Sequence, residues 1–262
     1  QTLKFGSDKL KSHNIDTHIL DSEILLSFIL NSSRENILMN LETNIKKNKF
    51  EKFKKLLSRR EKREPIAYIT NKKEFWKNNF YVNSDVLIPR PETELIVEEV
   101  LKNTNIHSSK KFLEIGTGSG CLVVSIIKER PKCFATAIDI SRKALNIAKF
   151  NAKMHHLINK INFVNIDIDK IQFNKYDFII SNPPYINRFD LSRLDESVKI
   201  FEPYIALEAG IDGLREITKL IIKSKKLLKK NGKLIFEIGQ GQNLITKKIL
   251  NKNGYFINKV IK

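Results

Sequence analysis

The sequence predicts an α/β protein in which a mostly parallel, doubly wound sheet follows a small all-α N-terminal domain and a β-hairpin linker. Three observations support this. Helix-like apolar patterns fill about the first 60 of the 262 residues, an aromatic and β-branched stretch follows, and strand-length apolar runs then alternate with helix-like stretches. We expect the helical domain at residues 1–72, the hairpin linker at residues 73–88 and the sheet domain at residues 89–262.

Two helices are predicted in the first domain. His18–Leu30 is dense in Ile, Leu and Phe, and a second segment places Phe50, Phe53, Leu56 and Leu57 on one face with Lys and Arg between them. This pattern predicts a small helical bundle with solvated lysines. A dedicated RNA-binding surface on the basic helix is the alternative.

The linker and the helix after it are marked by turn and capping residues. Pro65 ends the helical pattern, and residues 74–88 are aromatic and β-branched around an Asn-Asn pair, which predicts a hairpin. Pro91, followed by two glutamates, predicts a helix that begins there and runs to about Lys102, because proline suits the first turn and carboxylates suit the positive end of the helix dipole.

The sheet domain is predicted from alternating strands and helices. Helix-like stretches such as Ser141–Met154 and Ile217–Lys230 separate most of the apolar runs. This alternation predicts a parallel sheet covered on both faces, with ligands bound at the carboxyl ends of its strands. The predicted strands are Phe112–Ile115, Phe134–Ile138, Ile161–Val164, Phe178–Ile180 and Leu234–Ile238, with another at Tyr255–Ile261.

Charge and cysteine content narrow the class of protein. The net charge is +18, but only ten of the 47 basic residues are Arg, and residues 86–213 carry 17 basic against 16 acidic groups. The excess lies mainly in residues 214–262, so it does not indicate a basic groove around the predicted site.

Two cysteines cannot build a disulfide scaffold, which predicts a cytoplasmic protein, and no apolar run approaches the ~18 residues of a membrane span. The five histidines lack metal-ligand spacing, so no metal is expected.

A glycine loop follows the first predicted strand. The run Leu113–Gly120 ends in G-x-G-x-G, and Cys121 stands where the dinucleotide fingerprint requires its third glycine. The loop is therefore similar to motif I of S-adenosylmethionine-dependent methyltransferases, which have a Rossmann-like fold. The alternative for the loop is a purely structural turn. The alternative for Asp139, at the end of the next strand, is a helix cap for the segment that begins at Ser141. The predicted cofactor-binding residues are Glu114, Gly116, Thr117, Gly118, Gly120, Asp139 for the ribose, Asp167 for the adenine with Asp169 as its competitor, and Asn182.

The most informative string is Asn182-Pro183-Pro184-Tyr185, which follows the fourth strand. It resembles the catalytic motif of methyltransferases that act on an NH2 group conjugated to a planar system. Such a nitrogen is a poor nucleophile because its lone pair is delocalised. The Asn182 oxygen and the Pro183 carbonyl can each accept one N–H and aim the lone pair at a methyl carbon, while Tyr185 offers a flat face. These three are the predicted catalytic residues, and with Pro184 they are expected to bind substrate. The motif serves adenine, guanine and glutamine alike.

Further strings narrow the choice of substrate. Arg63–Ile69 precedes the hairpin, Ile88–Glu94 follows it, and Phe201–Pro203, Ala206-Leu207 and Gly210–Leu214 follow the catalytic loop. With the order of the domains, these strings resemble the HemK/PrmC family of peptide-chain release factor glutamine methyltransferases.

The resemblance implies a reaction, a substrate and a partner. S-adenosylmethionine would methylate the glutamine amide nitrogen in the Gly-Gly-Gln motif of class I release factors, giving N5-methylglutamine and S-adenosylhomocysteine. Asn182 and Pro183 would hold the amide beside Tyr185. The Pro89–Glu94 segment, with Arg90 and Glu92 as substrate-binding residues, would help to wall the pocket, and the helical domain would help to grip the release factor. We expect the protein to be a monomer. We expect activity without nucleic acid, although a weak contact with ribosomal RNA is compatible with the net positive charge.

The sequence departs from the family pattern in two places, and alternatives remain. Glu114 stands where Asp is usual, and the chain stops before the antiparallel strand that normally closes the sheet, so we expect that strand to be missing from a sequence that begins with Gln1. An N6-adenine or N2-guanine methyltransferase acting on RNA or DNA is the main alternative. The other alternative is a protein that binds the cofactor without catalysis. Such a protein would be expected to have lost Asn182 or the glycine loop, and this sequence keeps both.

Overall fold

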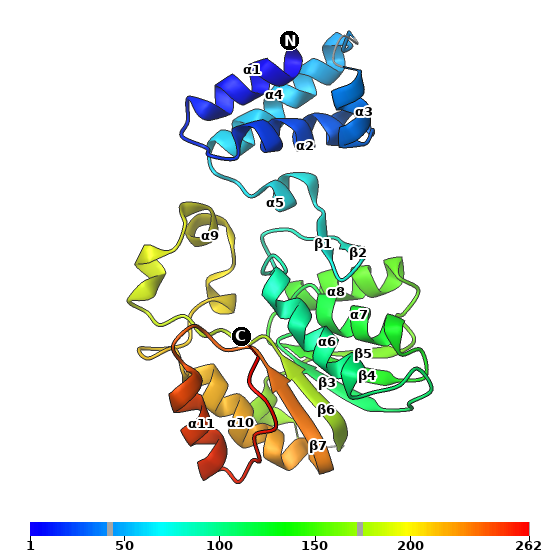
Figure 1. Ribbon diagram of the computed structural model, residues 1–262, viewed down its shortest axis with the longest axis vertical. Helices are drawn as coiled ribbons and strands as arrows, with labels where there is room; N and C mark the ends of the chain where they lie inside the picture. The colour runs from blue at the N-terminus through cyan, green and yellow to red at the C-terminus, as the bar shows by residue number, and fades with distance from the viewer. Residues whose placement is uncertain (41–43, 172–174, 262) are drawn as a thin grey trace. The chain divides into compact units, whose positions relative to one another are not determined.

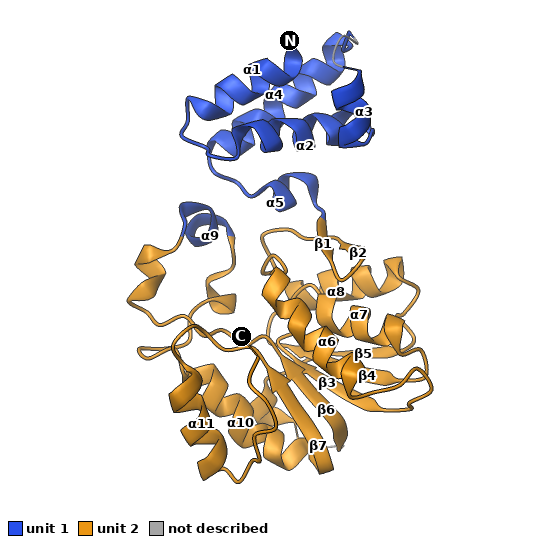
Figure 2. Ribbon diagram, in the orientation of Figure 1, with its two compact units in different colours: residues 1–72, 195–201 blue, residues 73–194, 202–262 orange. Residues whose placement is uncertain are grey.

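The computed structural model describes residues 1–40, 44–171 and 175–261, and it divides into two compact units. One unit comprises Gln1–Lys72 together with Asp195–Phe201, and the other comprises Lys73–Leu194 and Glu202–Lys262 (Figure 2). Asp195–Phe201 thus belongs to the helical unit although it lies far along the sequence, which the sequence pattern did not predict. Among the described residues, no helix has the length and apolar character to cross a membrane.

The first unit is a bundle of helices, and its residues 1–72 are coloured blue to cyan in Figure 1, whereas α9 is yellow. The predicted helices are confirmed as α2 (His18–Leu30) and α4 (Lys47–Glu61). On α4, Phe53 and Leu57 are fully buried against Leu10 and Leu25, so its apolar face points into the bundle as predicted. The remaining helices of this unit are α1 (Thr2–Lys11), α3 (Arg34–Met39), α5 (Ile66–Thr70) and α9 (Glu196–Phe201).

Ion pairs join distant segments within this unit. The Arg60 Nε donates to the buried Asp21 carboxylate at 2.7 Å, linking α4 to α2. Arg63 pairs with Glu196 of α9 at 2.9 Å. The second pair links the late segment Asp195–Phe201 to the residues that follow α4.

The second unit begins with a hairpin that is shorter than the predicted 73–88: its strands lie within residues 73–80, and residues 81–88 form no strand. Strands β1 (Lys73–Phe75) and β2 (Asn78–Phe80) pair antiparallel, and Phe75 lies opposite Asn78. The turn is formed by Trp76 and Lys77, both with positive φ (44° and 60°), and the Asn-Asn pair lies within β2. Two positive φ values give the tight twist that joins antiparallel strands through two residues.

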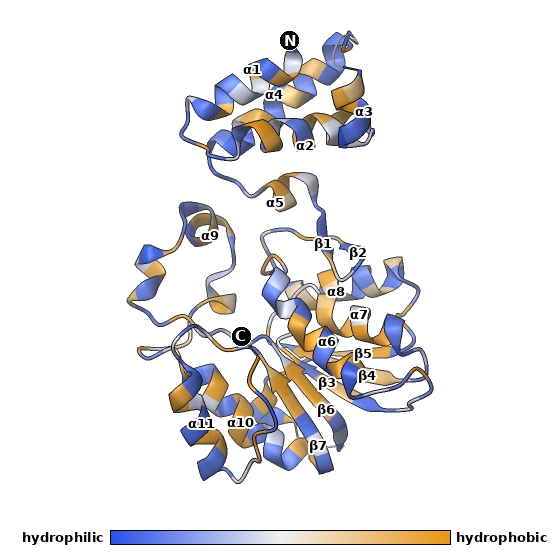
Figure 3. Ribbon diagram, in the orientation of Figure 1, coloured by the Kyte–Doolittle hydropathy of each residue, from blue (hydrophilic) through white to orange (hydrophobic). Residues whose placement is uncertain are grey.

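A five-stranded sheet forms the centre of this unit in the order β5-β4-β3-β6-β7, and all four pairings are parallel. The carboxyl ends of all five strands therefore meet at one edge of the sheet. Figure 3 shows that its strands are largely hydrophobic. The strands are β3 (Lys111–Ile115), β4 (Phe134–Asp139), β5 (Ile161–Asn165), β6 (Tyr176–Ser181) and β7 (Leu228–Phe236).

Both faces of the sheet are covered. On one face Phe112 and Phe178 pack with residues of α6, α7 and α8, and on the other Leu113 and Ile179 pack with Leu220 of α10. Alternate residues of one strand point to opposite faces, so continuous apolar strands build two cores. The helical elements are η1 (Pro91–Thr93), α6 (Glu94–Lys102), α7 (Cys121–Glu129), α8 (Arg142–Met154), η2 (Ile168–Lys170), η3 (Asp190–Arg193), η4 (Tyr204–Ala206), α10 (Arg215–Leu227) and α11 (Asn243–Lys252).

The end of the chain differs from the prediction. Tyr255–Ile261 forms no strand, so that prediction is wrong. Gly254 turns the backbone at φ 73°, the Tyr255 hydroxyl donates to the Ile221 carbonyl on α10, and Phe256 is 87% exposed. The segment is attached to α10 through a side chain rather than by a backbone ladder, and a strand needs such a ladder to form.

Candidate active site

The glycine loop joins β3 to α7 at the carboxyl edge of the sheet. The amides of Gly116 and Thr117 both donate to the Ile138 carbonyl at 3.0 Å, which ties the loop to the end of β4. Gly120 has φ 78°, and a Cβ there would lie 3.1 Å from the Ala148 Cβ on α8. A side chain would thus meet both an unfavourable backbone conformation and a neighbouring helix, so this glycine lets the loop pack closely.

Two carboxyl groups lie beside this loop. Asp139, at the end of β4, accepts hydrogen bonds from the amides of Gly118 (2.9 Å) and Ser141 (2.8 Å). Glu114 on β3 is 1% exposed and accepts a short hydrogen bond from the Thr117 hydroxyl. Burial raises the pKa of Asp139, and burial, with a smaller contribution from Asp139, raises the pKa of Glu114 to about 8. Both carboxyls would be stabilised by a hydroxyl donor or by a cationic ligand.

The cap of α8 is Ser141 rather than Asp139. The Ser141 Oγ accepts from the Ala144 amide at 3.2 Å, whereas Asp139 binds the Ser141 amide two residues on. An ionised carboxylate has about four acceptor positions, so its two backbone contacts leave room for ligand hydroxyls.

The Asn182–Tyr185 loop begins where β6 ends. The Ser181 Oγ donates to the Ile115 carbonyl at 2.8 Å, so the loop starts beside the glycine loop. The Asn182 Nδ2 donates to the Thr93 Oγ1 at 2.9 Å, and the Tyr185 hydroxyl donates to Glu237 at 2.9 Å. Burial first, and then the Glu237 carboxylate, raise the pKa of the Tyr185 hydroxyl, which therefore keeps its proton at neutral pH.

A second wall comes from the segment after the hairpin. The Glu202 carboxylate accepts from the Ile88 amide at 3.1 Å and from the Arg90 Nη2 at 2.6 Å. The Glu202 side chain is 1% exposed. A buried acceptor held by two donors, one of them a guanidinium, fixes this segment against the Phe201–Pro203 string.

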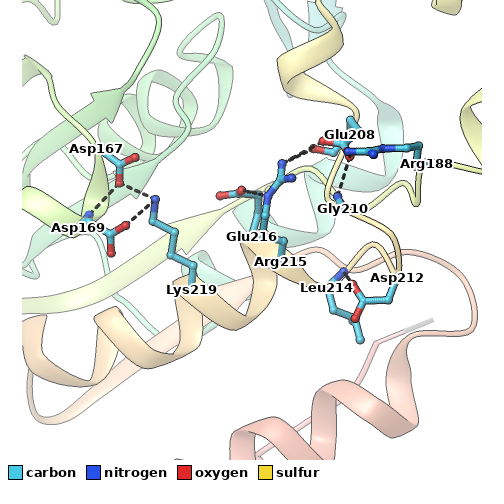
Figure 4. A network of polar contacts seen from close by, with 10 residues as sticks. All are labelled: Asp167, Asp169, Arg188, Glu208, Gly210, Asp212, Leu214, Arg215, Glu216 and Lys219. Atoms are coloured by element: carbon cyan, nitrogen blue, oxygen red, sulfur yellow. Dashed lines mark hydrogen bonds and ion pairs between the residues drawn. The ribbon is translucent and has the colours of Figure 1, made fainter.

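A third wall comes from α10 and the segment before it. Arg215 donates to the buried Glu208 at 3.0 Å and to Glu216 at 2.8 Å, as Figure 4 shows. Lys219 lies between two carboxylates, 2.6 Å from Asp167 and 2.9 Å from Asp169. These ion pairs place several charged groups along one side of the site.

The glycine loop and the start of the Asn182–Tyr185 loop form the first wall. Together with the second and third walls they line one cavity of about 340 Å³ within the second unit. Most of the predicted site residues line it: Arg90, Glu114, Gly116, Thr117, Gly118, Asp139, Asp167, Asn182, Pro183 and Pro184. Gly120, Glu92 and Tyr185 are not among its lining residues, and neither is Asp169, the competitor of Asp167. Tyr185 remains connected to the cavity through Glu237 and Thr93.

Several lining residues were not predicted from the sequence. Glu208, Arg215, Glu216 and Lys219 line the cavity, and so does Thr93, which lies within the Pro89–Glu94 segment that was expected to wall the pocket. Glu208 directly follows the family string Ala206-Leu207, and Arg215 directly follows Gly210–Leu214. Extending each string by one residue would therefore have included both side chains. Across residues 1–40, 44–171 and 175–261 there is no cluster of three or more His, Cys, Asp or Glu that could hold a metal ion.

Comparison with known families and solved structures agrees with this arrangement. Residues 106–259 match a methyltransferase domain family, and residues 1–70 match the PrmC N-terminal domain. The hMettl16 catalytic domain superposes with a TM-score of 0.53 at 21% identity, covering 67% of this chain and 66% of that one. A ribosomal protein L11 methylase from Lactobacillus delbrueckii gives 0.50 at 19% identity, covering 66% of this chain and 74% of that one. The fold is that of a methyltransferase.

Sequence relatives define the family more closely. A release factor glutamine methyltransferase from Clostridium acetobutylicum is 36% identical, covering 94% of this chain and 87% of that protein. One from Buchnera aphidicola is 38% identical, covering 92% of this chain and 86% of that protein. The chain also spans 55% of the length of a bifunctional methyltransferase from Rickettsia felis, at 36% identity. The chain belongs to the release factor glutamine methyltransferase family.

Proposed function

We propose that the protein transfers a methyl group from S-adenosylmethionine to the glutamine amide nitrogen in the Gly-Gly-Gln motif of class I peptide-chain release factors, giving N5-methylglutamine. The observation that carries this proposal is the position of Asn182-Pro183-Pro184 in the same cavity as the glycine loop and Asp139. A methyl donor and a planar NH2 group would meet there. The similarity of nearly the whole chain to enzymes named for release factor glutamine supports the protein substrate.

The cavity fits the cofactor in volume and chemistry. A volume of about 340 Å³ lies within the range of small-molecule sites. Asp139 would accept the ribose hydroxyls, the glycine loop would let the backbone approach closely, and the positively charged methionine portion would favour the ionised form of the buried Glu114. Asp167, whose carboxylate lies at the cavity wall, is our choice for the adenine. S-adenosylmethionine supplies an electrophilic methyl group.

The loop residues would prepare the amide nitrogen. Asn182 would accept one N–H through its Oδ1 and Pro183 the other through its carbonyl, which aims the nitrogen lone pair at the methyl group and stabilises the positive charge that develops there. A nitrogen–carbon bond forms, the carbon–sulfur bond breaks, and one amide proton leaves to solvent. Methylation makes the nitrogen acidic, so the site needs no strong base.

We also propose roles for the rest of the chain. Arg90 contributes to the wall that receives the glutamine, whereas Glu92 is exposed outside the cavity lining and would contact the release factor there. The helical unit docks the release factor, with the exposed lysines of α4 available for an acidic surface. We propose that the protein acts as a monomer and meets its substrate in the cytoplasm.

The test is a substrate comparison. The protein would be given methyl-labelled S-adenosylmethionine with a class I release factor, and in separate reactions with tRNA, rRNA and DNA. We expect label only on the release factor, at the Gly-Gly-Gln glutamine, and none on a release factor with that glutamine replaced by alanine. Label in nucleic acid with none on the release factor would replace this proposal by the adenine or guanine alternative.

A further inference from the structure

Four side chains form a continuous chain of hydrogen bonds behind the cavity. The Asn182 Nδ2 donates to the Thr93 Oγ1 at 2.9 Å, the Thr93 hydroxyl donates to the Glu237 Oε2 at 2.6 Å, and the Tyr185 hydroxyl donates to the Glu237 Oε1 at 2.9 Å. Thr93 is 3% exposed, so its hydroxyl relies on these partners. The Glu237 amide donates to the Ser181 carbonyl at 3.1 Å, which sets this glutamate beside the start of the catalytic loop.

The direction of these bonds follows from the chemistry of the groups. An ionised carboxylate only accepts, so both hydroxyls must point their hydrogens at Glu237. The Thr93 hydroxyl has a single hydrogen, and once it is donated to Glu237 the oxygen can only accept from Asn182. Asn182 must therefore turn its NH2 group toward Thr93, and its Oδ1 faces the other way.

We propose that Glu237, acting through Thr93, is a positioning residue that fixes the orientation of the Asn182 side-chain amide so that its oxygen is presented to the substrate. This inference rests on the proposed function, because an NH2 substrate needs an acceptor from Asn182. If the amide turned over, its NH2 group would face the NH2 group of the substrate, two donors opposite each other. The same carboxylate holds Tyr185, so one residue orders both ends of the catalytic loop.

Steady-state kinetics with the release factor test the hydroxyl link. Thr93→Val keeps the shape and removes the acceptor, and we expect kcat to fall about tenfold or more, as for a misplaced catalytic group. The dissociation constant for S-adenosylmethionine should stay within about twofold, because the cofactor is held by other residues. Thr93→Ser keeps the hydroxyl and should restore kcat. Equal loss in the Val and Ser variants, or unchanged kcat in the Val variant, would overturn the proposal.

The carboxylate is tested with Glu237→Gln. Its amide can donate to Thr93, which allows Asn182 to turn over, so kcat should fall about twofold or more as the fraction of correctly oriented enzyme falls. The matched control is Glu129→Gln, at the far end of α7, where the glutamate accepts a hydrogen bond from the Trp76 Nε1 at 3.1 Å. The Thr93→Val and Glu237→Gln double variant should lose less than the product of the two single losses. Losses that multiply fully would show that Glu237 does not act through Thr93.

A substrate-free measurement separates this inference from the proposed function. In protein labelled with ¹⁵N-asparagine, the side-chain NH2 signals of Asn182, assigned from their loss in Asn182→Ala, should shift in Thr93→Val and Glu237→Gln and remain in place in Thr93→Ser and Glu129→Gln. Unmoved signals in the first two variants would overturn the positioning role. A wild-type protein that labels RNA instead of the release factor would overturn only the proposed substrate, since this measurement needs none.

Discussion

Gly213 lies against the carbonyl oxygen of Tyr185 so closely that a Cβ on the glycine would be 2.5 Å from that oxygen. The Gln242 Nε2 joins the same place, donating to the carbonyls of Tyr185 (2.9 Å) and Gly213 (3.1 Å). The catalytic loop is thus held from behind by two segments that follow it in sequence. The glycine is required both for its φ of 72° and for this close approach.

Gly213→Ala should therefore displace the catalytic loop. The backbone conformation alone costs about 1–2 kcal/mol for a residue with a Cβ. The contact with Tyr185 adds to this, so both the melting temperature and kcat should fall. Gly241→Ala is the matched control, since Gly241 has φ 84° but nothing within 4 Å of its Cβ position. If the two variants lost stability and kcat equally, the close approach would have no role.

Asn182→Ala removes the acceptor for the substrate nitrogen. Loss of one positioned hydrogen-bonding group typically lowers kcat by about 100-fold or more, and we expect a loss of that size here. Binding of S-adenosylmethionine, measured by calorimetry, should be largely retained. Asn79→Ala, an exposed residue of β2 outside the cavity lining, is the control and should keep wild-type activity. Wild-type turnover in the Asn182 variant would remove this residue from the mechanism.

Glu114 makes stability depend on pH. Its pKa in the folded protein is raised to about 8 from an ordinary 4.5, because burial disfavours the charge. Between these values the folded state holds a proton that the unfolded state has lost, so the free energy of unfolding decreases as pH rises from about 4.5 to 8. Glu114→Gln removes this penalty.

Thermal unfolding of the ligand-free protein at pH 5 and pH 8.5 measures the effect. The melting temperature of Glu114→Gln, relative to wild type, should be higher at pH 8.5 than at pH 5, by an amount equivalent to a few kcal/mol at most. A difference between the two proteins that stays constant with pH would show that Glu114 is ionised throughout.

Gly6 in α1 should reverse a general rule. Glycine to alanine inside a helix usually stabilises by about 0.5–1 kcal/mol. A Cβ at Gly6, however, would lie 2.4 Å from the Ser22 Oγ and 2.6 Å from the Phe53 Cζ. We expect Gly6→Ala to destabilise the helical unit by about 1–3 kcal/mol through overpacking, with faster hydrogen exchange in that unit. Lys4 is exposed on the same helix, so Lys4→Ala should not destabilise the unit by overpacking. A Gly6→Ala variant more stable than the wild type would contradict the packing argument.

Local patterns in the sequence predicted most elements of this fold. His18–Leu30 was predicted with its observed bounds, and β3, β4, β5 and β6 were predicted within two residues at either end, because apolar runs and caps are local signals. The strand predicted at Leu234–Ile238 instead begins at Leu228. Its first half is polar, and it joins β6 with an irregular register between Tyr176 and Phe178, which periodicity does not reveal.

The candidate site was predicted where its residues are neighbours in sequence. The glycine loop and the Asn182–Tyr185 loop carry recognisable strings, and both contribute to the cavity lining. Thr93, Asn182 and Glu237 are joined only through the folded sheet, since separate loops and strand ends bring them together. No spacing rule links such residues, so their hydrogen bonds were visible only in three dimensions.

The late segment of the helical bundle affects the order of events during synthesis. Residues 1–72 leave the ribosome about 120 residues before Asp195–Phe201, the last part of their own unit. At about 5–20 residues per second, that segment follows roughly 6–25 s later, after β3 to β6 have emerged. The apolar core of the bundle lies between Leu10 and Ile69, and α9 contributes no buried residue, so this core can close before the late segment arrives. The Arg63–Glu196 pair is therefore a late fastening, closed only after most of the sheet exists.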